Sequence, residues 1–372
     1  MKLNGFRRKA DLLAQLRPGR THSRRELAAA AGLSVATVSR ITRDLVRRKV
    51  LLEVDGTRRA LGRPTQGLEL NGDSGRVLGV SLLYPALRWV LLDLRGDVLR
   101  RGEVPLPWRR GTAGVLGPLR KIVGSVARAE ARLKAVGLAL PGQWDPARGV
   151  SHRYPRVPSW RDVPLREHLE AWSEVPATLI GYAPAMAVAE QSRRRPAEPR
   201  NLITIEVAEN VAMGAIVNGA VLEGASGNAG ELGHIAADPA GLPCYCGSRG
   251  CLETVATCSA VTAALREASY EAAVRRARAG DAARVRVLTR AGRRLGTGLA
   301  TALNLFNPEV LVLNGRFFDA GPLVTDPVRA AIEEHAVPST LKSLTIEESA
   351  LGPLAAPLGA GLVAIRDAVR RL

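Results

Sequence analysis

The chain has 372 residues, 46% of them hydrophobic and 24% charged, a composition typical of globular proteins that excludes a disordered chain. It has no run of about 18 uncharged apolar residues, so we predict no membrane span and expect a cytoplasmic protein. The net charge of +18 is unevenly spread, because residues 1–72 hold 16 Lys/Arg and 6 Asp/Glu, a net of +10. So concentrated a basic segment favours a polyanionic partner, since neutralising phosphates releases counterions. Solvated arginine-rich faces account for the diffuse charge of the remaining residues.

In chain order, the first segment predicts a pair of helices and a sharp turn. A helix is expected over residues 7–16, with leucines along one side. Ser23 and Glu26 have the spacing of a capping box, in which the serine caps a second helix and the glutamate returns the bond. Gly32 permits the left-handed backbone that a tight turn between helices requires.

Ser34 caps a third predicted helix over residues 35–49. A stripe at helical spacing is expected to face inward, namely Val35, Val38, Ile41 or Thr42, and Leu45. The opposite face has small groups near the helix start and cations further along, which is the arrangement that a recognition helix needs to reach base edges and phosphates. The residues predicted to contact DNA are Ser34, Ala36, Thr37, Ser39, Arg40 and Arg43.

A basic hairpin follows. Residues 50–54 and 68–70 are predicted strands, and Asp55-Gly56 is a hairpin signal. Between them, Gly62-Arg63-Pro64 holds an extended arginine suited to a narrow minor groove. The wing residues predicted to contact DNA are Arg58, Arg59 and Arg63. Together these features predict a winged helix-turn-helix over residues 1–72 that binds double-stranded DNA. The alternative, a small helical interaction domain, leaves the arginine-rich hairpin unexplained.

From residue 73 the pattern changes to an α/β domain. Three strand-like runs are followed by helices that alternate with further strands, which predicts two similar lobes, roughly residues 73–195 and 196–372. The expected strands include residues 77–83, 89–94, 135–140, 202–207, 212–217 and 310–313, and the expected helices include residues 114–133, 260–265, 282–305 and 357–372.

The sharpest motif of this domain lies in residues 234–251. His234 precedes a cluster of three cysteines, Cys244, Cys246 and Cys251. Three thiolates and one imidazole complete a tetrahedral shell for zinc, with no position left for water, so the predicted role is structural. A set of buried free thiols is the alternative. Cys258 is expected to be a core residue.

Residues 223–234, Glu-Gly-Ala-Ser-Gly-Asn-Ala-Gly-Glu-Leu-Gly-His, together with the cysteine cluster, resemble the signature of the ROK family of bacterial repressors and sugar kinases. Pro141-Gly142 and residues 160–170 and 304–312 fit the same pattern in order, so the resemblance covers essentially the whole chain. It implies a two-lobed, actin-like, sugar-kinase-type ATPase fold. Members with a winged helix-turn-helix in front are sugar-responsive regulators, usually dimers or tetramers.

The chain departs from the family's kinases in four loops. Ser81-Leu82-Leu83-Tyr84-Pro85 stands where an Asp-x-Gly-Gly-Thr phosphate loop belongs, and residues 208–212, Ala-Glu-Asn-Val-Ala, replace Gly-Thr-Gly-x-Gly. Residues 314–316, Asn-Gly-Arg, replace the glycine cluster on the adenosine side. Gly181-Tyr182-Ala183-Pro184 replaces Asn-Asp-Ala-Asn, whose aspartate would deprotonate the sugar hydroxyl. We therefore predict degenerate nucleotide and sugar sites and no kinase activity.

Part of the sugar site that the resemblance implies is retained. Glu231 and His234 are present, and His234 can bind zinc through one ring nitrogen and face the cleft with the other. Arg156 and Tyr182 replace the family's amide and carboxylate groups, and Arg156 can pair with a phosphate or a carboxylate. The effector hypotheses are a sugar phosphate or sugar acid, no effector, and an ordinary sugar held by altered contacts.

These inferences predict a homodimeric or tetrameric transcriptional regulator, a repressor rather than an activator, on an inverted-repeat operator. The rival hypotheses are a sugar kinase with a DNA-binding domain and an effectorless dimeric regulator or scaffold.

Overall fold

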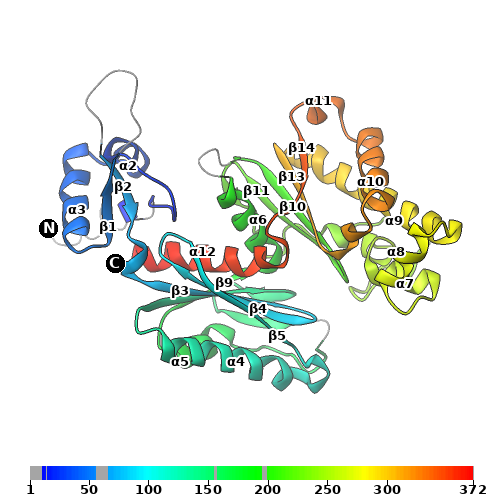
Figure 1. Ribbon diagram of the computed structural model, residues 1–372, viewed down its shortest axis with the longest axis horizontal. Helices are drawn as coiled ribbons and strands as arrows, with labels where there is room; N and C mark the ends of the chain where they lie inside the picture. The colour runs from blue at the N-terminus through cyan, green and yellow to red at the C-terminus, as the bar shows by residue number, and fades with distance from the viewer. Residues whose placement is uncertain (1–10, 14, 56–65, 155–156, 195–198, 372) are drawn as a thin grey trace. The chain divides into compact units, whose positions relative to one another are not determined.

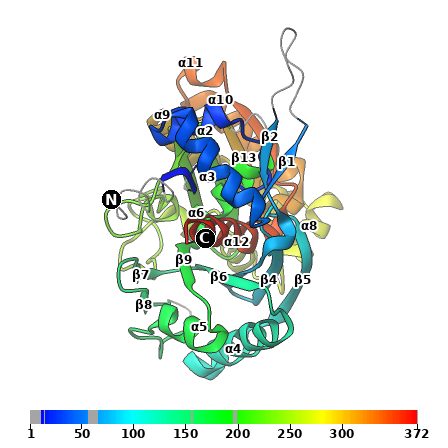
Figure 2. The same ribbon diagram turned by 90° about the vertical axis from the view of Figure 1, so that its left-hand side faces the viewer.

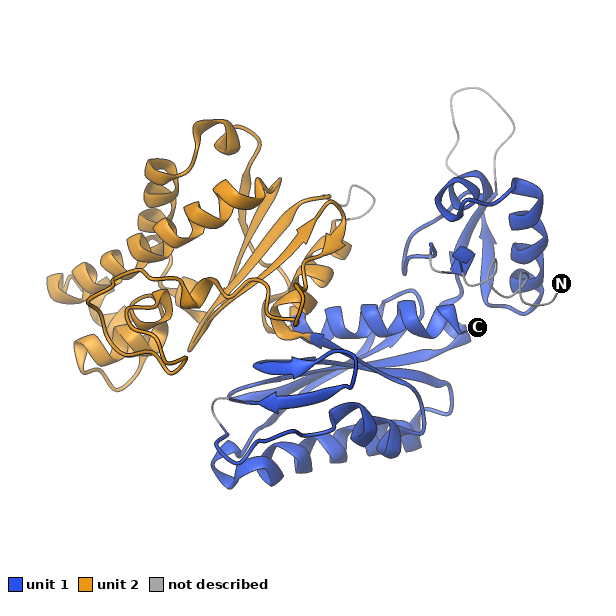
Figure 3. Ribbon diagram, turned by 180° about the vertical axis from the view of Figure 1, so that it is seen from behind, with its two compact units in different colours: residues 1–180, 356–372 blue, residues 181–355 orange. Residues whose placement is uncertain are grey.

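The computed structural model describes residues 11–13, 15–55, 66–154, 157–194 and 199–371, which form two compact units (Figure 3). Unit 1 holds residues 1–180 and 356–372, and unit 2 holds residues 181–355. This division corrects the predicted lobes 73–195 and 196–372, because the last helix returns to the first sheet. None of the helices in the described part of the chain is long and apolar enough to cross a membrane.

The described N-terminal part of unit 1 includes α2 (Arg24–Ala31) and α3 (Val35–Arg47), followed by the paired strands β1 (Leu51–Val54) and β2 (Gly67–Leu70) (Figure 1). The two strands pair antiparallel, with Leu51 opposite Leu70. The predicted third helix ends at Arg47, before Lys49 takes a left-handed φ of 57°. Of the first predicted helix, residues 11–13 are described and are helical.

Both predicted helix caps are confirmed. The Oγ of Ser23 accepts a hydrogen bond from the Glu26 N–H at 3.1 Å, and the Glu26 carboxylate accepts one from the Ser23 N–H at 2.9 Å. Gly32 ends α2 with a φ of 63°. The Oγ of Ser34 accepts from the Thr37 N–H at 3.2 Å. Each cap satisfies an N–H group that has no partner within its helix, a contribution of about 1 kcal/mol.

His22 holds the segment before α2 against the hairpin. Its N–H donates to the Leu68 carbonyl at 2.9 Å, and the Leu68 N–H donates back at 2.8 Å. The imidazole is 6% exposed, and its Nε2 accepts from the Arg17 N–H at 3.1 Å. Accepting that bond requires the neutral ring, and burial together with the nearby Arg20 lowers the pKa of His22 to about 4.

A short linker leads from β2 to the first sheet. Asn71 caps the 3-10 helix η1 (Gly72–Ser74) and donates through Nδ2 to the carbonyl of Lys49 at 2.8 Å, just beyond α3. On β2, the carboxylate of Glu69 pairs with the guanidinium of Arg95 at 3.1 Å. The linker is therefore tied by side-chain contacts both to the end of α3 and to the turn after the second strand of the sheet.

In the described residues of unit 1, a five-stranded sheet has the order β5-β4-β3-β6-β9. Its strands are β3 (Arg76–Leu83), β4 (Ala86–Asp93), β5 (Val98–Pro105), β6 (Leu133–Leu140) and β9 (Ala177–Gly181), and a small hairpin, β7 (Gln143–Asp145) and β8 (Val150–Arg153), follows β6. Strand β3 is antiparallel to β4 and parallel to β6.

Helices cover both faces of this sheet (Figures 1 and 2): α4 (Gly111–Ala129) and α5 (Leu165–Ser173) on one, α12 (Ala355–Arg370) on the other. Leu78 and Val80 of β3 belong to the core with α4 and α5. Gly79 lies between them and faces α12, where a Cβ would stand 2.1 Å from the Pro357 carbonyl oxygen. Gly137 on β6 meets the Ala360 carbonyl at the same distance. These glycines let the last helix lie directly on the sheet, which explains the corrected boundary.

The described part of unit 2 repeats the strand order, with a five-stranded sheet β12-β11-β10-β13-β14. Its strands are β10 (Leu202–Val207), β11 (Val211–Val217), β12 (Ala220–Val221), β13 (Val310–Asn314) and β14 (Thr345–Glu348). One face packs on α6 (Tyr182–Arg193), and the other on α7 (Cys258–Leu265), α8 (Tyr270–Arg278), α9 (Ala282–Phe306) and α10 (Pro322–His335), with α11 (Pro338–Leu341) beyond. The α/β prediction is confirmed.

We predict that His22 makes the N-terminal part of the chain acid-sensitive. The folded pKa is about 4 against 6.5 for a free imidazole, so between these values the unfolded chain binds a proton that the folded chain excludes. The free energy of unfolding should therefore be constant above pH 6.5 and fall by roughly 3 kcal/mol on going to pH 4. Urea unfolding at pH 7.5 and pH 4 measures this fall. His22→Gln should reduce it and His335→Gln, at an exposed site, should not; equal falls in all three proteins would contradict the prediction.

Candidate functional site

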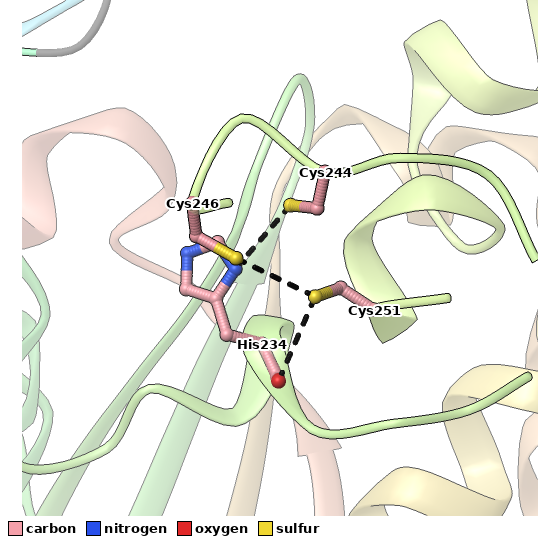
Figure 4. A group of neighbouring side chains, drawn as sticks. All are labelled: His234, Cys244, Cys246 and Cys251. Carbon is pink, nitrogen blue, oxygen red and sulfur yellow. Dashed lines mark hydrogen bonds between the residues drawn. The ribbon is translucent and has the colours of Figure 1, made fainter. Parts of the chain in front are cut away.

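The four predicted metal ligands converge in unit 2 (Figure 4). His234 ends the 3-10 helix η3 (Leu232–His234), and Cys251 immediately precedes η4 (Leu252–Thr254). The His234 Nδ1 lies 3.6 Å from the Cys244 Sγ, and the Sγ atoms of Cys246 and Cys251 are 3.7 Å apart. All four ligand atoms lie within 4.8 Å of one another.

Backbone bonds and a glycine shape the loop that carries these cysteines. The Cys244 N–H donates to the Ser248 carbonyl at 2.8 Å, and the Gly247 N–H donates to the Cys244 carbonyl at 3.0 Å. Gly250 has a φ of 65°, and a Cβ there would lie 1.5 Å from the Asp238 carbonyl oxygen. Only glycine fits this position, and the turn that it permits places Cys251 in the cluster.

The distances within the cluster fit a tetrahedral metal. With metal–sulfur bonds of about 2.3 Å and a metal–nitrogen bond of about 2.0 Å, tetrahedral geometry separates two sulfurs by about 3.8 Å and a sulfur from a nitrogen by about 3.5 Å. The separation of 3.7 Å between the Cys246 and Cys251 sulfurs and that of 3.6 Å between the His234 Nδ1 and the Cys244 sulfur are close to these values. Burial raises the pKa of the Cys251 thiol to about 12, so a metal ion must displace its proton on binding. Cys258, at the start of α7, is buried outside the cluster.

His234 presents its other ring nitrogen away from the sulfurs. Its Nε2 lies 3.2 Å from the Tyr245 Oη and 3.8 Å from the nearer oxygen of Glu231. The structure thus brings together two of the predicted ligand-binding residues, Glu231 and His234. Tyr182 is buried at the start of α6, and its hydroxyl donates to the Glu206 carboxylate at 2.8 Å. Arg156 lies outside the described residues.

Sequence reasoning missed two side chains of this site, Tyr245 and Glu253. Tyr245 is half-exposed between two cysteine ligands, and its ring meets that of His234 edge to face at 5.2 Å. Glu253 is buried, and its carboxylate accepts a hydrogen bond from the Val211 N–H at 3.0 Å. Burial, followed by the charge of Glu253, raises the pKa of Tyr245 above its usual range. The only signal in the sequence was that both residues lie within two positions of a cysteine ligand.

Ion pairs join two of the loops that depart from the kinase pattern. Glu209 lies in the turn between β10 and β11, and Arg316 follows β13. Their side chains form an ion pair, and Arg316 also pairs with Glu271 of α8 at 2.9 Å. The carboxylate of Glu209 brings negative charge to a turn that would have to admit a triphosphate, while the arginine is already neutralised by two acidic partners.

The exposed side of α3 carries most of the side chains predicted for it. Ser34, Ala36, Arg40 and Arg43 are exposed, and Thr37 and Ser39 are half-buried. Neither arginine has an ion-pair partner among the described residues, whereas Arg47 and Arg48 both pair with Asp44. One prediction is wrong: Val35 is 46% exposed instead of facing inward, since the first turn of α3 extends beyond the packed stripe of Val38, Thr42 and Leu45. Arg58, Arg59 and Arg63 lie outside the described residues.

Known proteins resemble the chain over most of its length. The DNA-binding transcriptional dual regulator NagC of Escherichia coli (strain K12) is 30% identical over 348 residues, covering 88% of this chain and 85% of the relative. A solved ROK family transcriptional regulator, a homologue of the E. coli MLC protein, superposes with a TM-score of 0.78 at 27% identity, covering 98% and 96% of the two chains. A ROK family glucokinase from Streptomyces griseus, solved with glucose and AMPPNP, gives a TM-score of 0.68 at 25% identity, covering 78% of this chain and 99% of that one. The model of the ROK family matches residues 79–367, so this chain belongs to the ROK family.

Proposed function

We propose that this ROK protein is a DNA-binding transcriptional regulator, a repressor rather than an activator, whose residues 1–72 form a winged helix-turn-helix. The observation that carries the proposal is the exposed face of α3, which offers Arg40 and Arg43 without ion-pair partners in the described part of the chain. Two unpaired cations beyond a start of small polar groups suit a helix lying in a major groove. The relatives named as transcriptional regulators support the same function.

The proposed regulator acts as a homodimer or tetramer on an inverted repeat. A two-fold protein places its two recognition helices about one turn of DNA apart, so its operator should carry the same symmetry. Residues 73–372 then supply assembly and sensing of a sugar, sugar phosphate or sugar acid. The adjacent carboxylate of Glu231 and imidazole of His234 support a hydroxyl-bearing effector.

The DNA prediction concerns the two unpaired arginines of α3. Arg40→Ala and Arg43→Ala should each weaken operator binding about tenfold or more, because each removes a charge-assisted contact. Loss of a phosphate contact should also lower the slope of log K against log salt by about 0.9. Fluorescence anisotropy over a range of salt concentrations measures both effects. Arg120→Ala is the matched control, since it removes an exposed arginine from α4. Equal weakening in all three variants would rule out the α3 face as the contact surface.

We also propose that His234, Cys244, Cys246 and Cys251 hold a structural zinc. Four protein donors complete the tetrahedron and leave no position for water, so the metal would fold the loop rather than act on a substrate.

Removing a ligand should release this metal. We expect about one zinc per chain in the purified protein, and Cys251→Ser should lose it and lower the melting temperature by several degrees. Cys258→Ser makes the same chemical change at a buried cysteine outside the cluster and should keep the zinc. Metal analysis and thermal melting are the two measurements. Stoichiometric zinc in Cys251→Ser would contradict the proposed ligand set.

The second candidate function, a sugar kinase with a DNA-binding domain, is favoured by the similarity to the glucokinase. We propose instead that the chain lacks kinase activity, because Glu209 and Arg316 are paired where the resemblance implies a nucleotide site. We expect no ATP-dependent phosphorylation of glucose, N-acetylglucosamine or xylose above the rate without protein in a coupled ADP assay. Turnover that is lost on further purification would indicate a contaminant; turnover that co-purifies with the full chain would overturn this proposal.

A further inference from the structure

The outward nitrogen of His234 needs a partner. When a histidine binds a metal through Nδ1, its Nε2 carries a hydrogen, and an acceptor for that hydrogen fixes the ring plane and strengthens the metal bond. Two groups lie near this nitrogen. The Tyr245 Oη is 3.2 Å away, within hydrogen-bond range, and the Glu231 carboxylate is 3.8 Å away, beyond it.

Tyr245 can act as that acceptor because its hydroxyl hydrogen can be donated to a different group. A phenol hydroxyl gives one hydrogen and accepts others. Tyr245 is 50% exposed, so its hydroxyl hydrogen can be donated to water. The hydroxyl can therefore donate to water and accept from His234 at the same time.

The position of Tyr245 in the loop also favours this role. The residue lies between two ligands, Cys244 and Cys246, so the metal and the phenol share one turn of backbone. Its side chain is 50% exposed, so burial of the ring is not what holds it there. The contacts that hold this side chain are the edge-to-face contact of its ring with the His234 imidazole and the contact of its hydroxyl with Nε2.

We propose that, in the protein without bound effector, Tyr245 is a positioning residue of the metal site, accepting a hydrogen bond from the His234 Nε2–H and so aiming Nδ1 at the metal. The inference rests on the zinc site proposed above. It adds an outer partner to the four ligands.

The test is the zinc affinity of the full chain, measured by competition with a chromogenic chelator. Tyr245→Phe keeps the ring and removes the acceptor, and we expect its zinc dissociation constant to rise by 10- to 100-fold, as on loss of other outer partners of metal-bound histidines. The Co²⁺-substituted variant should show shifted visible d–d bands, because the imidazole is free to turn. The matched control is Tyr270→Phe, which removes a buried hydroxyl bonded to the Phe317 carbonyl in the same unit. Its zinc affinity should not change.

The outcomes separate the two proposals. Weaker zinc binding in Tyr245→Phe with unchanged binding in Tyr270→Phe supports the positioning role. Unchanged affinity and Co²⁺ spectrum in Tyr245→Phe, with zinc lost in Cys251→Ser, overturn that role and leave the metal site in place. A parent protein that binds no zinc, and a Cys251→Ser variant that melts as the parent does, overturn both.

Discussion

Four donor atoms confined within 4.8 Å of one another are the constraint on which the functional half of unit 2 depends. A bound cation would compensate three thiolates held so closely and would cross-link η3, the cysteine loop and η4. The loop between these elements carries the exposed Cys246 and Tyr245, whereas Leu232 of η3 and Leu252 of η4 are buried in the core of unit 2.

Unit 2 also contains a cluster of ion pairs, in which carboxylates compensate a cationic side chain of the protein itself. Arg316 is held between Glu209 and Glu271, so the turn after β10 and the segment after β13 are joined by side chains. In a protein that binds nucleotide, such turns offer unpaired backbone N–H groups and short side chains to phosphate. The two arrangements therefore divide the lobe. One part brings together four side chains that could bind a cation, and in the other the charge of Arg316 is compensated by neighbouring carboxylates.

Much of the fold could be predicted because its signals are local. The starts of α2 and α3 are marked by capping residues within the first four positions of each helix, namely Ser23 with Glu26 and Ser34. The strands of both sheets are short apolar runs in the sequence. Val35 shows the limit of periodicity, which gives the direction of a side chain but not where the packing partner ends. The return of α12 to the first sheet depends on Gly79 and Gly137 meeting a helix more than 200 residues away, and no local pattern encodes such a contact.

The candidate site, too, has parts that a local sequence pattern predicts and parts that depend on contacts between distant residues. The metal ligands share a short segment, so they could be predicted together. The Glu209–Arg316 pair and the contact of Glu253 with Val211 join residues far apart in the chain, so the sequence contained no signal for them. Tyr245 was missed for a different reason: a tyrosine between two cysteines has no characteristic role until the direction of the imidazole is known.

The bond from Asn71 to the Lys49 carbonyl has a mechanical consequence. It joins the carboxyl end of α3 to the residue that begins the linker, so these two points move together. A rotation of η1 would therefore carry the end of α3 with it. If α3 lies in a DNA groove as proposed, the angle at which it enters the groove would depend on this single amide hydrogen bond, which lies outside the proposed contact face.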